Sequence, residues 1–198
     1  MKDIVYNAIG SQIENLKNLR QTSYSEDVLN AAKILVKCLK NKNKILIAGN
    51  GGSAADAQHF AAELVGRFLI ERRGLAAIAL TTDTSIITSV GNDYSFDDIF
   101  SRQIEALGIC GDVFIGISTS GNSKNIINCI EKSKLNGMKT ICLLGRDGGK
   151  LATLCDYPII IPFDFTPRIQ EVHTFTVHLL CEIIENNLFS KKDDIDED

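Results

Sequence analysis

The sequence predicts a doubly wound α/β protein built on a five-stranded parallel sheet. Five short runs are apolar throughout instead of alternating, as expected for parallel strands that are covered on both faces. These runs cover residues 45–48, 76–80, 113–117, 140–144 and 158–161. Helical patterns separate them, at about 54–66, 84–90, 97–107, 123–136 and 149–154. Strands that alternate with helices imply right-handed βαβ units and hence a parallel sheet.

Further helices flank this core. Two helical patterns precede the first strand, over residues 9–20 and 28–39, and a long one closes the chain at about 168–188. The last helix carries apolar residues on more than one face, which predicts burial on several sides. Because one sheet does not need all three helices, we expect them to pack in an oligomer.

Length and composition fit one domain. The chain has 198 residues, 44% of them hydrophobic, and no linker or repeat divides it. We expect a single domain over residues 1–189, followed by an acidic, frayed tail at 190–198. The net charge of −4 argues against a nucleic-acid surface.

The cysteines and the hydropathy of the chain indicate in which compartment the protein is found. The six cysteines stand at wide spacings, five of them in apolar or helical patterns, which favours buried free thiols over disulfides. No signal-like segment opens the chain, and no apolar stretch approaches the ~20 residues of a membrane span. The sequence therefore predicts a cytoplasmic protein without membrane contact.

A glycine-rich loop at 49–53 leaves the first strand and enters an alanine-rich helix. Such a helix start presents unpaired N–H groups and a positive dipole end, which suit an anion. One or two turns later, His59 and Glu63 stand four residues apart and share a helix face. An anion cradle and a pair suited to proton transfer or metal binding thus lie on one element.

A second loop follows the third strand. Residues 118–123 hold four hydroxyls and a glycine ahead of a helix, which is typical of a phosphate cradle. An ordinary N-cap with a serine-rich turn is the alternative, but four hydroxyls exceed what capping requires. A third loop, at 81–85 with Gly91, Asn92 and Asp93 after it, fits turns and caps as well as it fits a site.

Histidine is scarce, with only three in the chain. His173 and His178 are five residues apart, about 140° around a helix, so they cannot both face one site. We expect one of them to be structural.

Together these motifs resemble the phosphoheptose isomerases, the sedoheptulose 7-phosphate isomerase branch of the sugar-isomerase (SIS) domain proteins. The resemblance rests on residues 49–53, 57–63, 91–93, 116–123 and 168–173, and it extends to about residue 189. It implies a SIS-type, flavodoxin-like sheet and conversion of sedoheptulose 7-phosphate to D-glycero-D-manno-heptose 7-phosphate, for lipopolysaccharide or capsule. It also implies a homotetramer with active sites at subunit interfaces.

The resemblance further implies site residues. One zinc ion per subunit would be bound by His59, Glu63, Gln170 and His178. Substrate would contact Asn50, Gly51, Gly52, Glu63, Asn92, Asp93, Ser118, Thr119, Ser120, Ser123 and Gln170. Glu63 resembles the family's base and His178 its acid, which suits the proton transfer that aldose–ketose isomerisation needs. A zinc ion could polarise the carbonyl, yet it would also lower the basicity of Glu63, so a catalytic and a structural ion both remain open.

Three features of the match bear on the site. Gln170 and His178 lie eight residues apart, about 12 Å along a helix, so we expect the site to be completed across a subunit interface. Pro167 stands where some members have an acidic residue. Arg67 matches a family arginine, although a surface arginine at a helix end fits equally well.

Three other functions compete with this interpretation. A replication-initiator-associating relative lacks the glutamate and the final histidine, which are both present here as Glu63 and His178. SIS modules that sense sugar phosphates in regulators are normally fused to a DNA-binding domain, which this chain lacks. Another phosphosugar isomerase is the closest rival, because the cradle recognises phosphate more surely than chain length.

Overall fold

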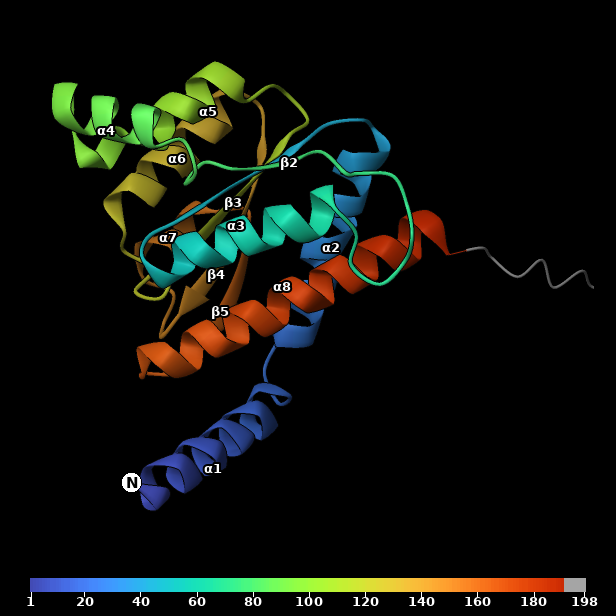
Figure 1. Ribbon diagram of the computed structural model, residues 1–198, viewed down its shortest axis with the longest axis vertical. Coiled ribbons are helices and arrows are strands. Elements are labelled where there is room, and N and C mark those ends of the chain that lie inside the picture. Colours follow the sequence, from blue (N-terminus) through green and yellow to red (C-terminus); the bar gives the residue numbers. More distant parts are fainter. Residues whose placement is uncertain (191–198) are drawn as a thin grey trace, which may run out of the picture.

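The computed structural model describes residues 1–190 and shows one parallel sheet of five strands in the order β2-β1-β3-β4-β5 (Figure 1). The strands are β1 (Ile45–Gly49), β2 (Ala77–Ala79), β3 (Val113–Ser118), β4 (Lys139–Gly145) and β5 (Tyr157–Ile161). β1 and β3 are buried at every position, as their unbroken apolar runs predict. The predicted five-stranded, flavodoxin-like sheet is confirmed. Most of the acidic tail predicted at 190–198 lies outside the described residues.

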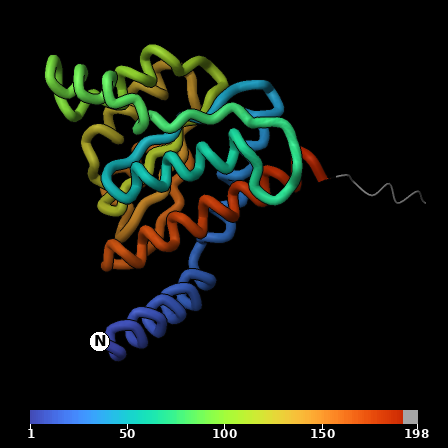
Figure 2. Tube along the Cα trace, in the orientation of Figure 1, coloured from blue at the N-terminus to red at the C-terminus, as the bar shows by residue number. Residues whose placement is uncertain are grey.

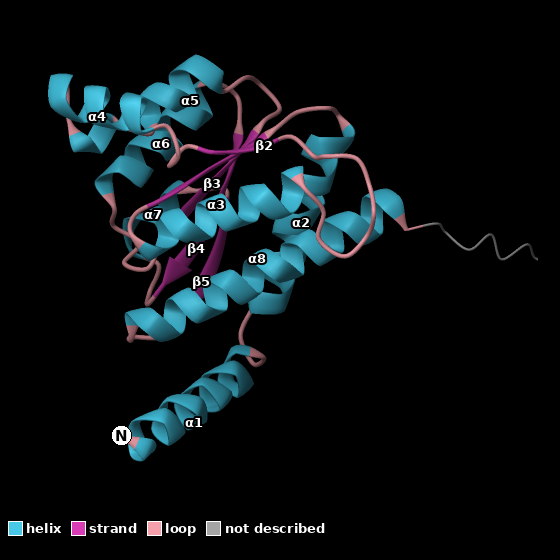
Figure 3. Ribbon diagram, in the orientation of Figure 1, coloured by secondary structure: helices cyan, strands magenta, loops and turns pink. Residues whose placement is uncertain are grey.

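Helices cover both faces of the sheet (Figure 3). On one face lie α2 (Tyr24–Lys40), α3 (Gly52–Val65) and α8 (Thr166–Phe189), which share an apolar core with the sheet. On the other face α5 (Ser101–Leu107), α6 (Lys124–Leu135) and α7 (Gly149–Leu154) bury a second apolar cluster. α3 and α8 pack directly against each other, which places two distant parts of the sequence side by side.

Two helices stand apart from these layers. α1 (Lys2–Leu19) extends away from the sheet and buries only Leu19 (Figure 2). Its other large apolar side chains, among them Ile9 and Ile13, are exposed. α4 (Thr84–Asp93) buries no residue and lies at one margin of the molecule. α2 and α8 bury most of their apolar residues within this chain, whereas α1 leaves its apolar surface exposed; the expected packing in an oligomer stays a prediction.

The structure divides the single helix expected at 97–107. A 3₁₀ turn, η1 (Phe96–Asp98), is followed by α5. Ser95 caps the turn by accepting the Asp97 N–H at 3.0 Å. Ile99 and Phe100 between the two segments are buried and keep right-handed helical dihedrals, so the first turn is tightened to a 3₁₀ turn, as is common at helix ends.

The cysteines are free thiols, five of them buried and Cys110 exposed. This agrees with the prediction from their spacing. Among residues 1–190, no helix combines the length and the apolar character needed to cross a membrane.

Candidate active site

The strand order reverses between β1 and β3. In a sheet of order 2-1-3-4-5, ligands bind outside the carboxyl ends of the strands at this switch point. Both predicted cradles leave the sheet there: the glycine-rich loop after β1 and the serine-rich loop after β3. The topology therefore brings the two loops to one edge.

A pair of amides joins these loops. Asn50 Nδ2 donates to Asn125 Oδ1, and Asn125 Nδ2 donates to Asn50 Oδ1, both at 2.9 Å. Asn125 is buried in the first turn of α6. Next to Asn50, Gly51 has a φ of +56°, which favours glycine and turns the chain into α3.

The serine-rich loop gathers its hydroxyls. Ser118 Oγ lies 3.0 Å from Ser123 Oγ and 3.5 Å from Ser120 Oγ. A glycine on β3 allows this placement, because a Cβ on Gly116 would lie 2.6 Å from Ile126 Cγ2; α6 thus packs closely on the strand. The hydroxyls cluster just before the amino end of α6, where an anion is favoured. Thr119 is half-buried beside them.

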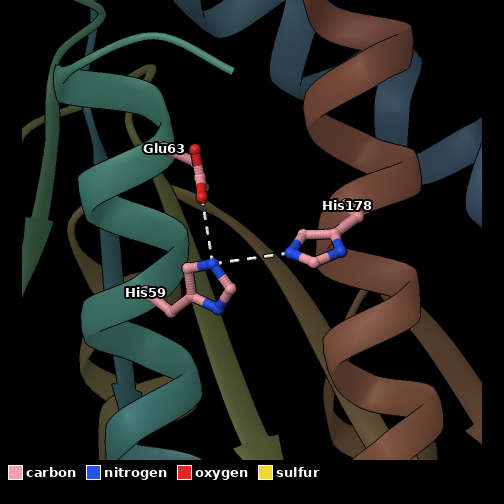
Figure 4. A group of neighbouring side chains, drawn as sticks. All are labelled: His59, Glu63 and His178. Atoms are coloured by element: carbon pink, nitrogen blue, oxygen red, sulfur yellow. Dashed lines mark hydrogen bonds and ion pairs between the residues drawn. The ribbon is translucent and has the colours of Figure 1, made fainter. Parts of the chain in front are cut away.

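Three predicted residues converge between α3 and α8 (Figure 4). His59 Nε2 lies 3.0 Å from Glu63 Oε1 and 3.4 Å from His178 Nε2. The donor atoms of His59, Glu63 and His178 all lie within 4.8 Å of one another, and each side chain is partly exposed. We call this group the His-Glu-His cluster.

The spacing of the cluster fits one small cation. Zinc–nitrogen distances of about 2.0–2.1 Å and tetrahedral angles put neighbouring donor atoms about 3.3–3.4 Å apart, close to the 3.0 and 3.4 Å that separate His59 Nε2 from the other two donor atoms. A single proton on His59 Nε2 can point to Glu63 or to His178 but cannot serve both. Two imidazoles and a carboxylate also make a common three-ligand zinc set with an open fourth position.

Gln170 does not join this cluster in the same chain. Its side-chain amide lies against Gly52, at the start of α3. His59 is seven residues further along α3, about 10 Å away. Three of the four candidate ligands therefore need no second subunit, and the predicted completion across an interface now concerns Gln170 alone.

Asn92 and Asp93 also lie away from the cluster. They are exposed at the end of α4, where Asn92 Nδ2 donates to Asp93 Oδ1 at 2.8 Å. Their predicted contact with substrate stays a prediction. Arg67 is 59% exposed and pairs with Glu71 at 3.4 Å, which agrees with its interpretation as a surface arginine.

His173 and His178 take different environments, as their spacing predicts. His178 faces the site, whereas His173 is fully buried and neither of its ring nitrogens makes a well-formed hydrogen bond. Burial lowers the pKa of His173 to about 4, and the backbone of Leu144 opposes this shift to a smaller extent. His173 is thus a neutral core residue.

Several neighbours of the site were not predicted. Phe68 stacks on His178, with ring centroids 5.4 Å apart and an interplanar angle of 29°. Asp56 accepts a hydrogen bond from Thr174 at 2.8 Å, and burial raises the pKa of its carboxyl. Asp56 stands one turn before His59, so its place on the same helix face was a usable signal. Asn125 and Phe68 offered none, because their partners lie far away in sequence.

The switch-point loops and the neighbouring cluster define an α/β protein with a site suited to an anionic ligand such as a phosphate ester. Residues 10–145 match the SIS domain family. The phosphoheptose isomerase of Aliarcobacter butzleri is 54% identical over 188 residues, covering 95% of this chain and 99% of that protein.

Solved structures agree with the sequence comparison. The phosphoheptose isomerase of Neisseria gonorrhoeae superposes with a TM-score of 0.88 at 45% identity, covering 93% of this chain and 98% of that one. The enzyme of Francisella tularensis gives 0.89 at 40% identity, with coverages of 93% and 97%. The chain therefore belongs to the SIS domain family and, within it, to the phosphoheptose isomerases. As such it is a phosphosugar isomerase.

Proposed function

We propose that this enzyme interconverts sedoheptulose 7-phosphate and D-glycero-D-manno-heptose 7-phosphate through an enediol. The observation that carries the proposal is the convergence of Glu63 and His178 on His59 beside two anion-suited loops. The names of the relatives, phosphoheptose isomerases, support a seven-carbon substrate.

The phosphate would bind at the serine-rich loop. Ser118, Ser120 and Ser123 present hydroxyls close together, and Thr119 lies between them. The amino end of α6 adds its dipole. The glycine-rich loop, with Asn50, Gly51 and Gly52, would contact the sugar chain. His59 lies about 10 Å from that loop along α3, a distance that an extended heptose phosphate can bridge.

Glu63 and His178 would carry out the proton transfer. Glu63 is the proposed base that takes a proton from C1 of the ketose and returns it to C2. His178 is the proposed acid that serves the substrate oxygens. Positioned acid–base catalysis of this kind contributes about 10²–10⁴-fold to a rate.

Zinc is the proposed ion of the cluster, with His59, Glu63 and His178 as ligands and Gln170 as the fourth, from a second subunit of a homotetramer. When bound, it would polarise the carbonyl and stabilise negative charge on the substrate oxygens. Ligation would also make Glu63 a weaker base, so a structural ion is the second candidate role.

The reaction would be the first step toward a nucleotide-activated heptose for lipopolysaccharide or capsule. We place it in the cytoplasm. Free cysteine thiols support a reducing compartment.

The test is incubation of the purified enzyme with sedoheptulose 7-phosphate, read by NMR for the heptose aldose. Fructose 6-phosphate and ribulose 5-phosphate serve as shorter ketoses. We expect turnover of the seven-carbon ketose alone. Absence of that turnover, or faster turnover of a shorter ketose, would contradict the proposal.

A further inference from the structure

A buried carboxylate lies on α8, two turns beyond His178 of the His-Glu-His cluster. Glu185 of α8 has a side chain that is 1% exposed. It accepts backbone hydrogen bonds from Phe68 at 2.8 Å, Leu69 at 2.7 Å and Ile70 at 2.9 Å. Arg72 Nε donates to the same carboxylate at 2.8 Å. One buried side chain thus holds the loop that connects α3 to β2.

Arg72 ties this loop to the end of α3. Its Nη2 donates to the Glu63 carbonyl at 2.8 Å, and its Nη1 donates to the carbonyls of Leu64 at 2.9 Å and Gly66 at 3.1 Å. These carbonyls belong to the last turn of the helix, where a cation is favoured. The guanidinium therefore caps the helix that carries His59 and Glu63.

Both partners connect to the cluster by short paths. Glu185 follows His178 by seven residues, which is two turns along the same face of α8. Phe68, whose N–H binds Glu185, stacks on the His178 ring. Glu63 offers its carbonyl to Arg72 and its carboxylate to His59.

We propose that Arg72 and Glu185 form a positioning clamp that fixes α3 against α8 and holds Phe68 over the His178 ring. This role rests on the function proposed above. The clamp sets the separation of Glu63 from His178, and Phe68 restricts the orientation of the His178 imidazole. Arg72, Glu185 and Phe68 are positioning residues, which act through the cluster.

A purely stabilising role explains these features less well. Buried ion pairs are weak contributors to stability, because the cost of desolvation offsets their attraction, and apolar residues often serve as well. Their directed hydrogen bonds do fix geometry. Burial raises the pKa of Glu185, but the three backbone N–H groups and Arg72 outweigh this effect and lower it overall. The carboxylate thus stays charged and keeps all of its partners.

The first test compares two variants that each weaken one buried carboxylate site. Glu185→Gln disrupts the clamp. Asp112→Asn is the control, because the buried Asp112 binds Lys44, Asn43 and the Ile109 N–H just before β1 and β3, at the opposite edge of the sheet. Chemical denaturation measures the stability of both, and ¹H–¹³C NMR reads the ring signals of His59 and His178. We expect both variants to lose stability and Glu185→Gln alone to move those signals.

The same two variants distinguish a role in positioning the cluster from a role in binding the substrate. We expect Glu185→Gln to lower kcat and zinc affinity by about 10- to 100-fold, as for groups that orient metal ligands, with a smaller change in KM. Asp112→Asn should change none of the three. Zinc affinity is measured against a chelator without substrate, so this result stands even if the enzyme prefers another sugar phosphate.

Phe68 provides an independent test if Glu185→Gln does not fold. Phe68→Leu removes the ring above His178, whereas Phe68→Tyr keeps it. We expect Phe68→Leu to shift the His178 ring signals and to lower kcat, and Phe68→Tyr to restore both toward the wild type. Wild-type His178 signals, kcat and zinc affinity in Phe68→Leu would overturn the proposal, as would equal effects of Glu185→Gln and Asp112→Asn on the cluster.

Discussion

The side-chain amides of Asn50 and Asn125 exchange two hydrogen bonds of 2.9 Å across the switch point of the sheet. Asn50 belongs to the loop after β1, and Asn125 belongs to the helix that follows the β3 loop. The pair therefore fixes the proposed sugar-binding loop against the proposed phosphate-binding loop.

Replacing Asn125 should loosen the two loops. In Asn125→Ala the Asn50 amide loses both partners, so we expect KM for the sugar phosphate to rise about 3- to 10-fold, the value of one or two hydrogen bonds. kcat should change less. Asn128→Ala is the control, because Asn128 lies on the same helix and donates to Asp97 and Asp98 instead. An equal rise in KM for both variants would contradict this role.

Zinc should act on two of the three histidines. We expect addition of Zn²⁺ to metal-free enzyme to shift the ring signals of His59 and His178 in ¹H–¹³C NMR spectra, because their Nε2 atoms are the proposed ligands. His173 is an internal reference, since its ring is buried elsewhere in the core. A shift confined to His173, or saturation without any change at His59, would disprove the assignment of ligands.

Burial of a neutral His173 predicts a pH dependence of stability. Its folded pKa of about 4 lies below the ordinary 6.5, so the unfolded chain binds the additional proton between these values. Stability should therefore be complete above pH 6.5 and fall as the pH drops toward 4, by about 1 kcal/mol between pH 7.5 and pH 5.5.

Urea unfolding at the two pH values measures this loss. The variant His173→Leu isolates it, because it removes the titrating ring while other groups titrate as before. We expect the loss between pH 7.5 and pH 5.5 to be smaller in His173→Leu than in the wild type. An identical loss in both proteins would show that His173 does not cause it.

Mixed oligomers test whether Gln170 serves a neighbouring subunit. If so, Gln170→Ala and Glu63→Gln chains, each inactive alone, should regain activity when refolded together, because one supplies the cluster and the other supplies Gln170. A mixture of Glu63→Gln and His178→Gln chains is the control. It should stay inactive, because Glu63 and His178 belong to the cluster of one chain and every mixed site lacks one of them. Equal activity of the two mixtures would argue against a shared site.

Much of the fold follows from local pattern, whereas the contacts between distant segments do not. The apolar runs place all five strands, and the four-residue spacing places His59 and Glu63 on one face of α3. The helical rise also separates Gln170 from His178 correctly. The change from a 3₁₀ turn to an α-helix at Ile99 and Phe100 was missed, because both residues keep helical dihedrals and the apolar pattern does not distinguish the two helix types.

The packing of α3 on α8 could not be predicted from local sequence pattern. His178 reaches His59 across 119 residues of sequence, and Glu185 reaches Arg72 across 113. Only the tertiary fold sets such pairs, so resemblance to a family was needed for the first, and the second was not predicted. A glutamate on an apolar helix, seven residues after His178, was the available signal for a buried partner.

The most direct test of the central claim is isomerisation of sedoheptulose 7-phosphate in D₂O, read by NMR for deuterium at C2 of the aldose. Glu71→Gln serves as the control, because Glu71 is an exposed glutamate outside the cluster. The account predicts deuterium at C2 with the wild type and with Glu71→Gln, and a loss of turnover and exchange of about 10²–10⁴-fold in Glu63→Gln. Wild-type turnover and exchange in Glu63→Gln would contradict it.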